Sequence, residues 1–551
     1  MEEFDTIIVG AGSAGCVLAN RLSEDSGYRV LLLEAGPKDR SILLHMPAAL
    51  AHPLANDRFN WFYESEPEPH RDGRRMYCPR GRVLGGSSSI NGMAYVRGHA
   101  RDYDRWAQSG LVGWDYAHCL PYFRRAETHE LGADAYHGED GPLKVTAGKM
   151  RNPLFQAWIE AGRQAGYPIT EDMNGAQQEG LGRMDQTCWG GERWSAAKGY
   201  LKPARSRENL TVRTGALTLR VTLDGRRATG VDYAVNGETR SARATREVIL
   251  GGGAINSPQL LMLSGIGPAD ELRALGIDVV ADLPGVGENL QDHLEIYIQH
   301  ACTQPITLYS ALKPLNQLKI GVEWILFRRG LGTSSHFEAG GFIRSRAGVE
   351  HPDLQYHFLP IAMNYDGSNP ANSHGYQAHV GPMRPTSTGT VKLRSADPRQ
   401  APSILFNYMA TEQDRSEMRE GVRLTREILA QPAFDPFRGP ELAPGPDVKT
   451  DAEIDAFVRA HGESAYHPSC TCKMGPETDN TAVVDGQTRV HGLEALRVVD
   501  ASIMPSIVSG NLNAPTIMLA EKAADMILGK SPLPAADAEV WIHPEWETAQ
   551  R

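Results

Sequence analysis

The sequence predicts an α/β fold that begins with a dinucleotide-binding unit, and three observations lead to this prediction. Residues 4–9 form a β-branched apolar run typical of a buried parallel strand, and residues 28–33 form a second one. Residues 16–22 between them carry apolar side chains at helical spacing. A strand, a helix and a strand in this order make a βαβ unit. Residues 247–250 and 496–502 repeat the pattern of a strand that ends at a turn.

The turn after the first strand has the composition of a phosphate-binding loop, with a G-x-G-x-x-G pattern in residues 10–15. Gly10 permits the tight turn, Gly12 lets the backbone approach a pyrophosphate, and Gly15 allows the helix to pack closely on the strand. Unpaired N–H groups at the helix N-terminus then face the phosphates. Glu34 follows 19 residues after Gly15, where a carboxylate accepts a hydrogen bond from a ribose 2′-hydroxyl. The pattern predicts dinucleotide binding and leaves both NAD and FAD open.

Residues 81–92, with the sequence GRVLGGSSSING, favour FAD. Small residues and N–H donors suit a place where a planar group and its phosphates must pass. A flexible serine-rich loop is the alternative, and the apolar and aromatic flanks argue against it. Further along, residues 251–261 predict a glycine turn and a helix opened by Ser257 and Pro258, whereas residues 209–250 predict strands near the dinucleotide. Residues 514–527 have helical periodicity.

Composition and charge exclude several classes of protein. The 551 residues contain 56 Lys and Arg against 67 Asp and Glu, a net charge of −11, which argues against nucleic-acid binding. Seven scattered cysteines fit a reducing compartment better than a disulfide framework. There is no basic signal region and no apolar run of about 18 residues. We expect a cytoplasmic protein without a signal peptide or transmembrane helix, and peripheral attachment to the inner face of the membrane stays open.

Three segments together resemble the glucose–methanol–choline (GMC) family of flavin oxidoreductases: the N-terminal βαβ unit, residues 81–91 and residues 253–267. The resemblance covers about residues 4–530. Three further segments are similar to the choline-oxidising branch of the family, namely residues 336–342, 355–360 and 406–409.

The resemblance implies a Rossmann-like FAD-binding domain interleaved with an α+β substrate domain built on an antiparallel sheet. The FAD-binding domain would comprise residues 1–150, 200–290 and 470–530. The substrate domain would comprise residues 151–199 and 291–469, and residues 531–551 would form a tail on the surface. Periodicity alone does not reveal this interleaving.

The cofactor implied by the resemblance is FAD. Some family members tether FAD covalently through a histidine at the position held here by Ile90, which cannot form that bond. We therefore predict dissociable FAD. The residues implied to contact FAD are Gly10, Gly12, Ser13, Ala14, Gly15, Glu34, Ala35, Arg82, Gly85, Gly86, Ser87, Asn91, Gly92, Thr218, Asp500, Ala501 and Asn511.

The resemblance assigns the catalytic pair to two residues near the C-terminal end. An alcohol is oxidised by giving a hydride to the flavin, so the protein must manage the hydroxyl proton and the developing charge. His467, one of 18 histidines, is implied to be the acid/base, and the Asn511 amide is implied to hydrogen-bond the substrate oxygen. A structural histidine and a turn asparagine are the alternatives, and Asn513 is a second candidate for the helix cap.

The substrate implied is choline, whose quaternary ammonium group donates no hydrogen bond and is recognised by a carboxylate and aromatic faces. Glu295 matches the acid that faces this group in the family, with a surface salt bridge as the alternative. Trp61 and Tyr466 are predicted to act as a pair of cage aromatics, and Trp324 is a third candidate. Taken singly, each of the three is better explained as a core residue.

The implied reaction is the oxidation of choline to betaine aldehyde, with further oxidation to glycine betaine left open. The expected partner is a quinone or other respiratory electron acceptor; the alternatives are an oxidase that uses O₂, a hydroxynitrile lyase and a nicotinamide enzyme. No metal site is predicted, because Cys470 and Cys472 lack the second pair of ligands that zinc requires. Residues 315–329 predict either a surface helix with basic ends or, as the favoured interpretation, a helix packed over the substrate domain. No oligomeric state is predicted.

Overall fold

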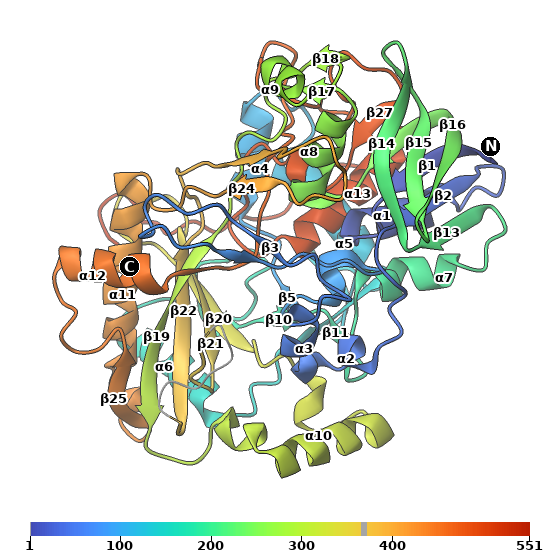
Figure 1. The fold of residues 1–551 in the computed structure, drawn as a ribbon. Coiled ribbons are helices and arrows are strands. Elements are labelled where there is room, and N and C mark those ends of the chain that lie inside the picture. Colours follow the sequence, from blue (N-terminus) through green and yellow to red (C-terminus); the bar gives the residue numbers. More distant parts are fainter. Residues whose placement is uncertain (1, 365–371) are drawn as a thin grey trace.

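The computed structural model describes residues 2–364 and 372–551, and two large sheets organise it (Figure 1). The first sheet has the order β13-β2-β1-β16-β15-β14, and β27 pairs with β16. Its parallel strands carry the predicted βαβ unit, which is confirmed, with helix α1 (Ser13–Leu22) between β1 and β2. The strands are β1 Glu2–Val9, β2 Val30–Glu34, β13 Leu210–Thr214, β14 Ala216–Asp224, β15 Arg227–Val235, β16 Glu238–Leu250 and β27 Leu496–Val498.

The carboxyl ends of β1, β2 and β16 meet at one edge of this sheet, because these strands are parallel. Open α/β sheets bind ligands at this edge. The predicted close packing behind the first turn is confirmed, since a Cβ atom on Gly15 would lie 1.8 Å from the Gly10 carbonyl oxygen. Helix α13 (Asn513–Ile527), which matches its predicted range, packs against α1.

The second sheet has the order β25-β19-β22-β21-β20-β9-β8, and β26 pairs with β19. All its neighbours are antiparallel except β8 and β9, which confirms the predicted antiparallel sheet. Helices α6 (Pro153–Gln164) and α11 (Glu412–Leu429) share a hydrophobic core with it. The strands are β8 Ile169–Thr170, β9 Gly180–Arg183, β19 Leu294–Cys302, β20 Ala339–Ile343, β21 Leu354–Leu359, β22 Gly375–Pro382, β25 Arg438–Ala443 and β26 Glu463–Ser464.

A smaller sheet has four strands in the order β5-β10-β7-β6. It pairs three strands from residues 94–147 with β10 at residues 185–186. Its strands are β5 Ala94–Tyr95, β6 Glu127–His129, β7 Leu143–Ala147 and β10 Asp185–Gln186. Further helices are α2 Ile42–His45, α3 Ala51–Leu54, α4 Ala100–Gln108, α5 Tyr116–Ala126, α7 Lys202–Ala204, α9 Ala269–Ala274 and α12 Asp451–His461. The remaining strands are β3 Tyr63–Glu64, β4 Tyr77–Cys78, β11 Cys188–Trp189, β12 Glu192–Arg193, β17 Ile266–Gly267, β18 Ala281–Asp282, β23 Thr390–Lys392 and β24 Ser403–Leu405.

Helix α8 spans Gly253–Leu263, so the predicted start at Ser257 and Pro258 was wrong. A proline inside a helix leaves the carbonyl four residues earlier without its usual N–H donor. Here that carbonyl belongs to Ala254, and the Thr471 hydroxyl donates a hydrogen bond to it at 2.6 Å. A segment distant in sequence therefore supplies the donor that Pro258 removes, and the helix continues through the proline.

Helix α10 (Pro314–Phe327) stands away from the rest of the molecule at the bottom of Figure 1. Of its residues only Trp324 is buried, so the favoured prediction that it packs over the substrate domain was wrong. The Trp324 indole N–H donates to the Gly191 carbonyl at 2.6 Å, and this ring is a core residue. The exposed large apolar residues on the helix are Leu315, Leu318, Val322, Ile325, Leu326 and Phe327.

The last residues of the chain run over the surface as an irregular segment. The backbone N–H of Ala536 donates to Ala117, and that of Trp541 donates to Ala176. At the C-terminus, Arg551 forms an ion pair with Glu427 of α11. No helix among the described residues has the length and hydropathy needed to cross a bilayer.

Candidate active site

A cavity of about 1100 Å³ lies at the carboxyl edge of the first sheet and reaches the second sheet. Both predicted catalytic residues, the three predicted substrate contacts Glu295, Tyr466 and Trp61, and most predicted cofactor contacts line it, whereas the further candidate Trp324 does not. Gly15 and Gly85 do not line it. The predicted cofactor residues in its wall are Gly10, Gly12, Ser13, Ala14, Glu34, Ala35, Arg82, Gly86, Ser87, Asn91, Gly92, Thr218, Asp500, Ala501 and Asn511.

The wall of the cavity near the first sheet fits a dinucleotide. The Glu34 carboxylate accepts hydrogen bonds from the backbone of Ala11 (2.9 Å) and Gly36 (2.8 Å). Burial raises the pKa of Glu34 to about 7, against the opposing effect of these two N–H groups. A Cβ atom on Gly86 would lie 2.6 Å from the Gly12 Cα atom, so the two glycine loops touch and leave room for phosphates instead of side chains. The buried Thr218 hydroxyl has no hydrogen-bond partner among the described residues.

Three of the predicted cofactor residues, Asp500, Arg82 and Gly85, also have structural roles within the protein. The Asp500 carboxylate accepts hydrogen bonds from the Gly253 N–H (2.8 Å) and the Ser257 hydroxyl (2.6 Å), so it holds the start of α8. The Arg82 guanidinium lies over the Trp61 ring, 5.4 Å from its centroid. Gly85 has a φ angle of 91°, which allows the turn that begins the serine-rich segment.

The predicted catalytic pair is brought together: the Asn511 amide nitrogen lies 3.1 Å from Nε2 of His467. The Nδ1 atom of His467 lies 3.0 Å from Nδ1 of His293, whose Nε2 atom is 3.1 Å from the Met383 carbonyl oxygen. A carbonyl only accepts, so Nε2 of His293 carries the proton and its Nδ1 accepts from His467. Nε2 of His467 therefore presents a lone pair towards Asn511 and the cavity.

The protonation state of His467 follows from its surroundings. Burial lowers the pKa of His467 well below 6.5, and the neighbouring His293 and His357 lower it further. The imidazole is therefore neutral at neutral pH and able to accept a proton. Its backbone is fixed as well, because its N–H donates to Asp292 at 2.6 Å and the preceding Tyr466 carbonyl accepts from Arg80 at 2.6 Å.

Glu295 lies on β19, two residues after His293, and its carboxylate lines the same cavity. It is only 8% exposed, which rules out the alternative of a surface salt bridge. His379 Nδ1 lies 3.2 Å from one carboxylate oxygen, and His357 Nδ1 lies 3.9 Å from the other. Trp61 and Tyr466 both line the cavity.

Four residues at this centre were not predicted: His293, Asp292, His357 and His379. For two of them, His357 and His379, the sequence contains a pattern from which they could have been predicted. On β21 and β22 the buried aromatics Tyr356, Phe358 and Tyr376 belong to the core, whereas His357 and His379 face the cavity. Successive side chains of a strand point to opposite faces of the sheet, so polar residues that alternate with core aromatics lie on the face away from the core. Such a pattern indicates a face that is available for a binding site.

Asn513 does not cap α13, since the cap position is Leu512 and makes no side-chain bond. Instead its amide oxygen accepts a hydrogen bond from the Ser13 hydroxyl at 2.8 Å, joining α13 to the first glycine turn. Cys470 and Cys472 are both buried.

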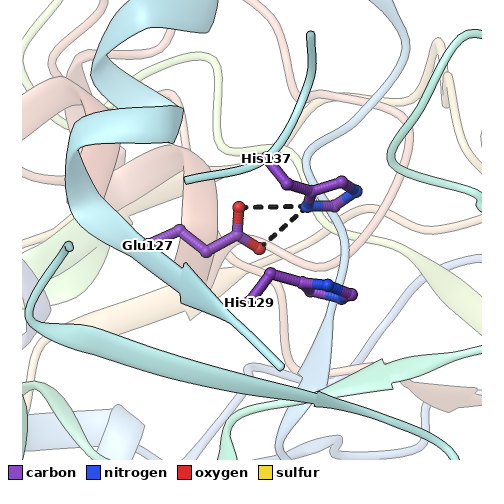
Figure 2. Close-up of side chains that lie close together, drawn as sticks. All are labelled: Glu127, His129 and His137. Carbon is purple, nitrogen blue, oxygen red and sulfur yellow. Dashed lines mark hydrogen bonds and ion pairs between the residues drawn. The ribbon is translucent and has the colours of Figure 1, made fainter. Parts of the chain in front are cut away.

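Two groups of side chains among the described residues have the composition of a metal site: Glu295 with His357 and His379, and Glu127 with His129 and His137 (Figure 2). In the second group Glu127 already pairs with Arg97, and His137 donates to Glu127 through Nδ1 (3.1 Å) and to Asp172 through Nε2 (2.9 Å). An imidazole that donates through both nitrogens is a cation, and ligation requires the neutral form. The group is therefore a charge-balanced structural network.

We expect this network to make stability depend on pH above neutrality. Burial by itself lowers the pKa of His137, but the hydrogen bonds to Asp172 and Glu127 outweigh it and raise the pKa to about 9. A raised folded-state pKa stabilises the protein fully below the unfolded value of about 6.5, and the contribution, roughly 3 kcal/mol, is lost as the pH rises through 9. Urea unfolding of the wild type and His137→Gln between pH 6 and 10 should converge with rising pH. Parallel curves would contradict the assignment.

Comparison with known proteins shows the family to which the chain belongs. Residues 4–295 and 385–520 match the N-terminal and C-terminal family models described as GMC oxidoreductase. The chain is 60% identical to the mitochondrial choline dehydrogenase of Mus musculus over 98% of this chain and 92% of the relative. It is 60% identical to the oxygen-dependent choline dehydrogenase of Pseudomonas fluorescens (strain Pf0-1), over 98% and 96%.

Among solved structures, pyridoxine 4-oxidase from Mesorbium loti has a TM-score of 0.87 and 32% identity, covering 96% of this chain and all of that one. A formate oxidase has a TM-score of 0.90 and 27% identity, covering 96% and 98%. The chain therefore belongs to the GMC oxidoreductase family.

Proposed function

We propose that this protein is an FAD-dependent enzyme that oxidises choline to betaine aldehyde, with oxidation to glycine betaine as a candidate second step. The observation that carries the proposal is a single cavity that holds a neutral His467 beside Asn511 and, in the same cavity, the buried carboxylate of Glu295. Relatives 60% identical over nearly the whole chain bear the name choline dehydrogenase. The interleaved division into an FAD-binding and a substrate domain is part of the proposal.

The geometry of the cavity supports the following roles. Nε2 of His467 accepts the hydroxyl proton, and the Asn511 amide supports the substrate oxygen. Glu295 attracts the trimethylammonium group, with Trp61 and Tyr466 as aromatic neighbours in the cavity wall. The glycine turns and Glu34 hold the dinucleotide. When bound, FAD supplies a two-electron acceptor for the hydride that leaves the alcohol carbon.

The visible spectrum of FAD-loaded protein before and after anaerobic addition of choline tests this function. Bleaching of the oxidised flavin bands is the expected result. If choline leaves the spectrum unchanged and an uncharged alcohol bleaches it, the assignment of FAD stands, but choline as substrate and the proposed role of Glu295 are wrong. Turnover without any flavin reduction would favour a lyase, and protein without flavin but active with NAD would favour a nicotinamide enzyme.

We expect FAD to be held without a covalent bond. Ile90 is buried among Leu44, Phe59 and Val83, and its side chain offers no atom that bonds the flavin. Acid precipitation of the loaded protein should leave a colourless pellet and a yellow supernatant, and denaturing gels should show no flavin fluorescence in the protein band. A yellow pellet would contradict the prediction.

We propose that electrons pass to a quinone or other apolar respiratory carrier at a membrane surface. The apolar face of α10 is exposed, and Gln317, Ile320 and Gly321 of the same helix line the cavity. An apolar helix at the border of the cavity suits a carrier dissolved in a bilayer. Lys313 and Lys319 add positive charge that attracts anionic lipids. Oxygen is the second candidate, because a bacterial relative is named oxygen-dependent; stoichiometric hydrogen peroxide would identify it.

The proposed attachment predicts that Leu318→Glu with Ile325→Glu weakens binding to phosphatidylglycerol-containing vesicles at least about tenfold, since each apolar side chain withdrawn from lipid costs roughly 1.5–3 kcal/mol. These two residues are 65% and 51% exposed, so the fold should tolerate the change. Val112→Glu with Leu131→Glu is the matched control, because these residues are also exposed (94% and 67%) but lie outside α10. Equal vesicle binding by all three proteins would exclude α10 as the attachment site.

A further inference from the structure

The orientation of the Gln377 side chain is fixed by groups that permit only one arrangement. Its amide oxygen accepts hydrogen bonds from the backbone N–H of Met363 (2.8 Å) and from the Gln299 side-chain amide (2.9 Å). A backbone N–H only donates, so the oxygen of Gln377 must face Met363 and its NH₂ group must point the other way. That NH₂ group lies 2.7 Å from Nε2 of His379.

The Gln377 amide in turn determines the tautomer of His379. Because the NH₂ group donates, Nε2 of His379 accepts, and the proton of the neutral ring is on Nδ1. Nδ1 lies 3.2 Å from the nearest Glu295 carboxylate oxygen, at ion-pair distance, so its N–H group lies beside the carboxylate. The ring is held in this orientation by Tyr297, which stacks on it with centroids 3.7 Å apart.

We propose that His379 and Gln377 are positioning residues that hold the Glu295 carboxylate ionised and aimed at the ammonium group of the substrate. This inference rests on the proposed function, in which Glu295 binds a quaternary ammonium. A buried carboxylate is costly without hydrogen-bond donors, and an N–H donor stabilises the ionised form. The relay from Gln377 through His379 places such an N–H group beside the carboxylate without adding a positive charge that would repel the substrate.

The relay also explains why Glu295, His357 and His379 act as a cation receptor instead of a metal site. A metal ion at Nδ1 of His379 would require the proton to move to Nε2, where it would face the NH₂ group of Gln377. The same tautomer that disfavours ligation favours the donation to Glu295. The group therefore suits a large organic cation that needs a carboxylate and no coordinate bond.

The test compares two substitutions of His379 in FAD-loaded enzyme. His379→Phe keeps a ring but removes the donor, whereas His379→Asn places an amide NH₂ near the position of Nδ1. Choline and its uncharged isostere 3,3-dimethylbutan-1-ol are compared by their dissociation constants in anaerobic flavin reduction. Binding of tetramethylammonium, measured by calorimetry, gives a readout independent of turnover.

We expect His379→Phe to weaken binding of choline and tetramethylammonium about 10- to 100-fold, the range for the loss of an N–H group that supports a charged group, and to leave the uncharged alcohol nearly unchanged. The acid limb of choline binding should move to higher pH, because a carboxylate that loses a donor has a higher pKa. His379→Asn should restore most of the affinity and the pH profile.

Gln377→Leu tests the tautomer itself. Without the NH₂ donor, the proton of His379 is free to move to Nε2, and the lone pair on Nδ1 then repels the carboxylate. The substitution should weaken choline binding in the wild-type background and have little effect in the His379→Asn background, since an amide donor does not depend on a tautomer. Flavin content and thermal midpoint confirm folding of each variant. Equal effects in both backgrounds would overturn the proposal.

Failure of the inference and failure of the proposed function are distinguishable. If Glu295→Gln weakens choline and the uncharged alcohol equally, the proposed role of Glu295 is wrong. If Glu295→Gln separates the two alcohols but His379→Phe does not, the role of Glu295 stands and the relay is rejected.

Discussion

A His467→Gln variant is expected to lose about 10²- to 10⁴-fold in the rate of flavin reduction by choline, the range associated with loss of a general base. Nε2 of His467 presents a lone pair to the cavity, because the contacts of His293 with Met383 direct the proton of His467 to Nδ1. Glutamine retains hydrogen bonding to Asn511 but does not accept the hydroxyl proton at neutral pH. Stopped-flow spectroscopy without oxygen measures the effect.

The matched control for this variant is His300→Gln. His300 lies on β19 but does not line the cavity, and its Nδ1 atom contacts the Gly439 carbonyl. We expect wild-type flavin reduction in the control and unchanged flavin content in both variants. The wild-type rate of flavin reduction should fall only at acidic pH, where His467 becomes protonated, since burial lowers the pKa of His467 well below 6.5. Full activity of His467→Gln would remove His467 from the catalytic role.

A Glu295→Gln variant is expected to bind choline roughly 10²- to 10³-fold more weakly, because the loss of one partner of a buried ion pair costs about 3–5 kcal/mol. Glu295 is buried, so water screens its charge little. The uncharged isostere 3,3-dimethylbutan-1-ol should be affected by less than about threefold. The two alcohols have nearly the same shape, so the ratio of their dissociation constants isolates the charge.

The control for this variant is Glu463→Gln on β26, the strand paired with β19 beside Glu295. The Glu463 carboxylate pairs with Arg74 and does not line the cavity. The Glu463→Gln variant should therefore change the ratio of the two dissociation constants far less than Glu295→Gln does. A Glu295→Gln variant that binds both alcohols equally poorly would contradict the recognition of the ammonium group by this carboxylate.

Local sequence patterns were enough to predict the secondary structure of the dinucleotide-binding half of the molecule. The roles of Gly10 and Gly15 were predicted correctly, because the tight turn and the close packing of helix on strand involve residues within one short segment. The strands of residues 209–250 and helix α13 followed from period-2 and helical spacing. His467, Asn511 and Glu295 were assigned by resemblance to a family, and the cavity brings all three together.

The predictions that failed depended on contacts between distant segments. Pro258 lies inside α8 because Thr471 donates to the Ala254 carbonyl, a contact that no local pattern contains. Helix α10 has an ordinary apolar composition, and only the folded chain shows that nothing among the described residues covers Leu318 and Ile325.

The sequence by itself determined the βαβ unit, the dinucleotide turn and the family, because these depend on spacing within short stretches of chain. The tertiary structure decided the protonation chemistry. His467 and His293 are separated by 174 residues, and their contact sets which nitrogen faces the cavity. The Gln377 amide likewise determines the tautomer of His379 beside Glu295. Tautomers and pKa values depend on burial and on partners brought together by folding, so they are properties of the packed chain and not of any segment of it.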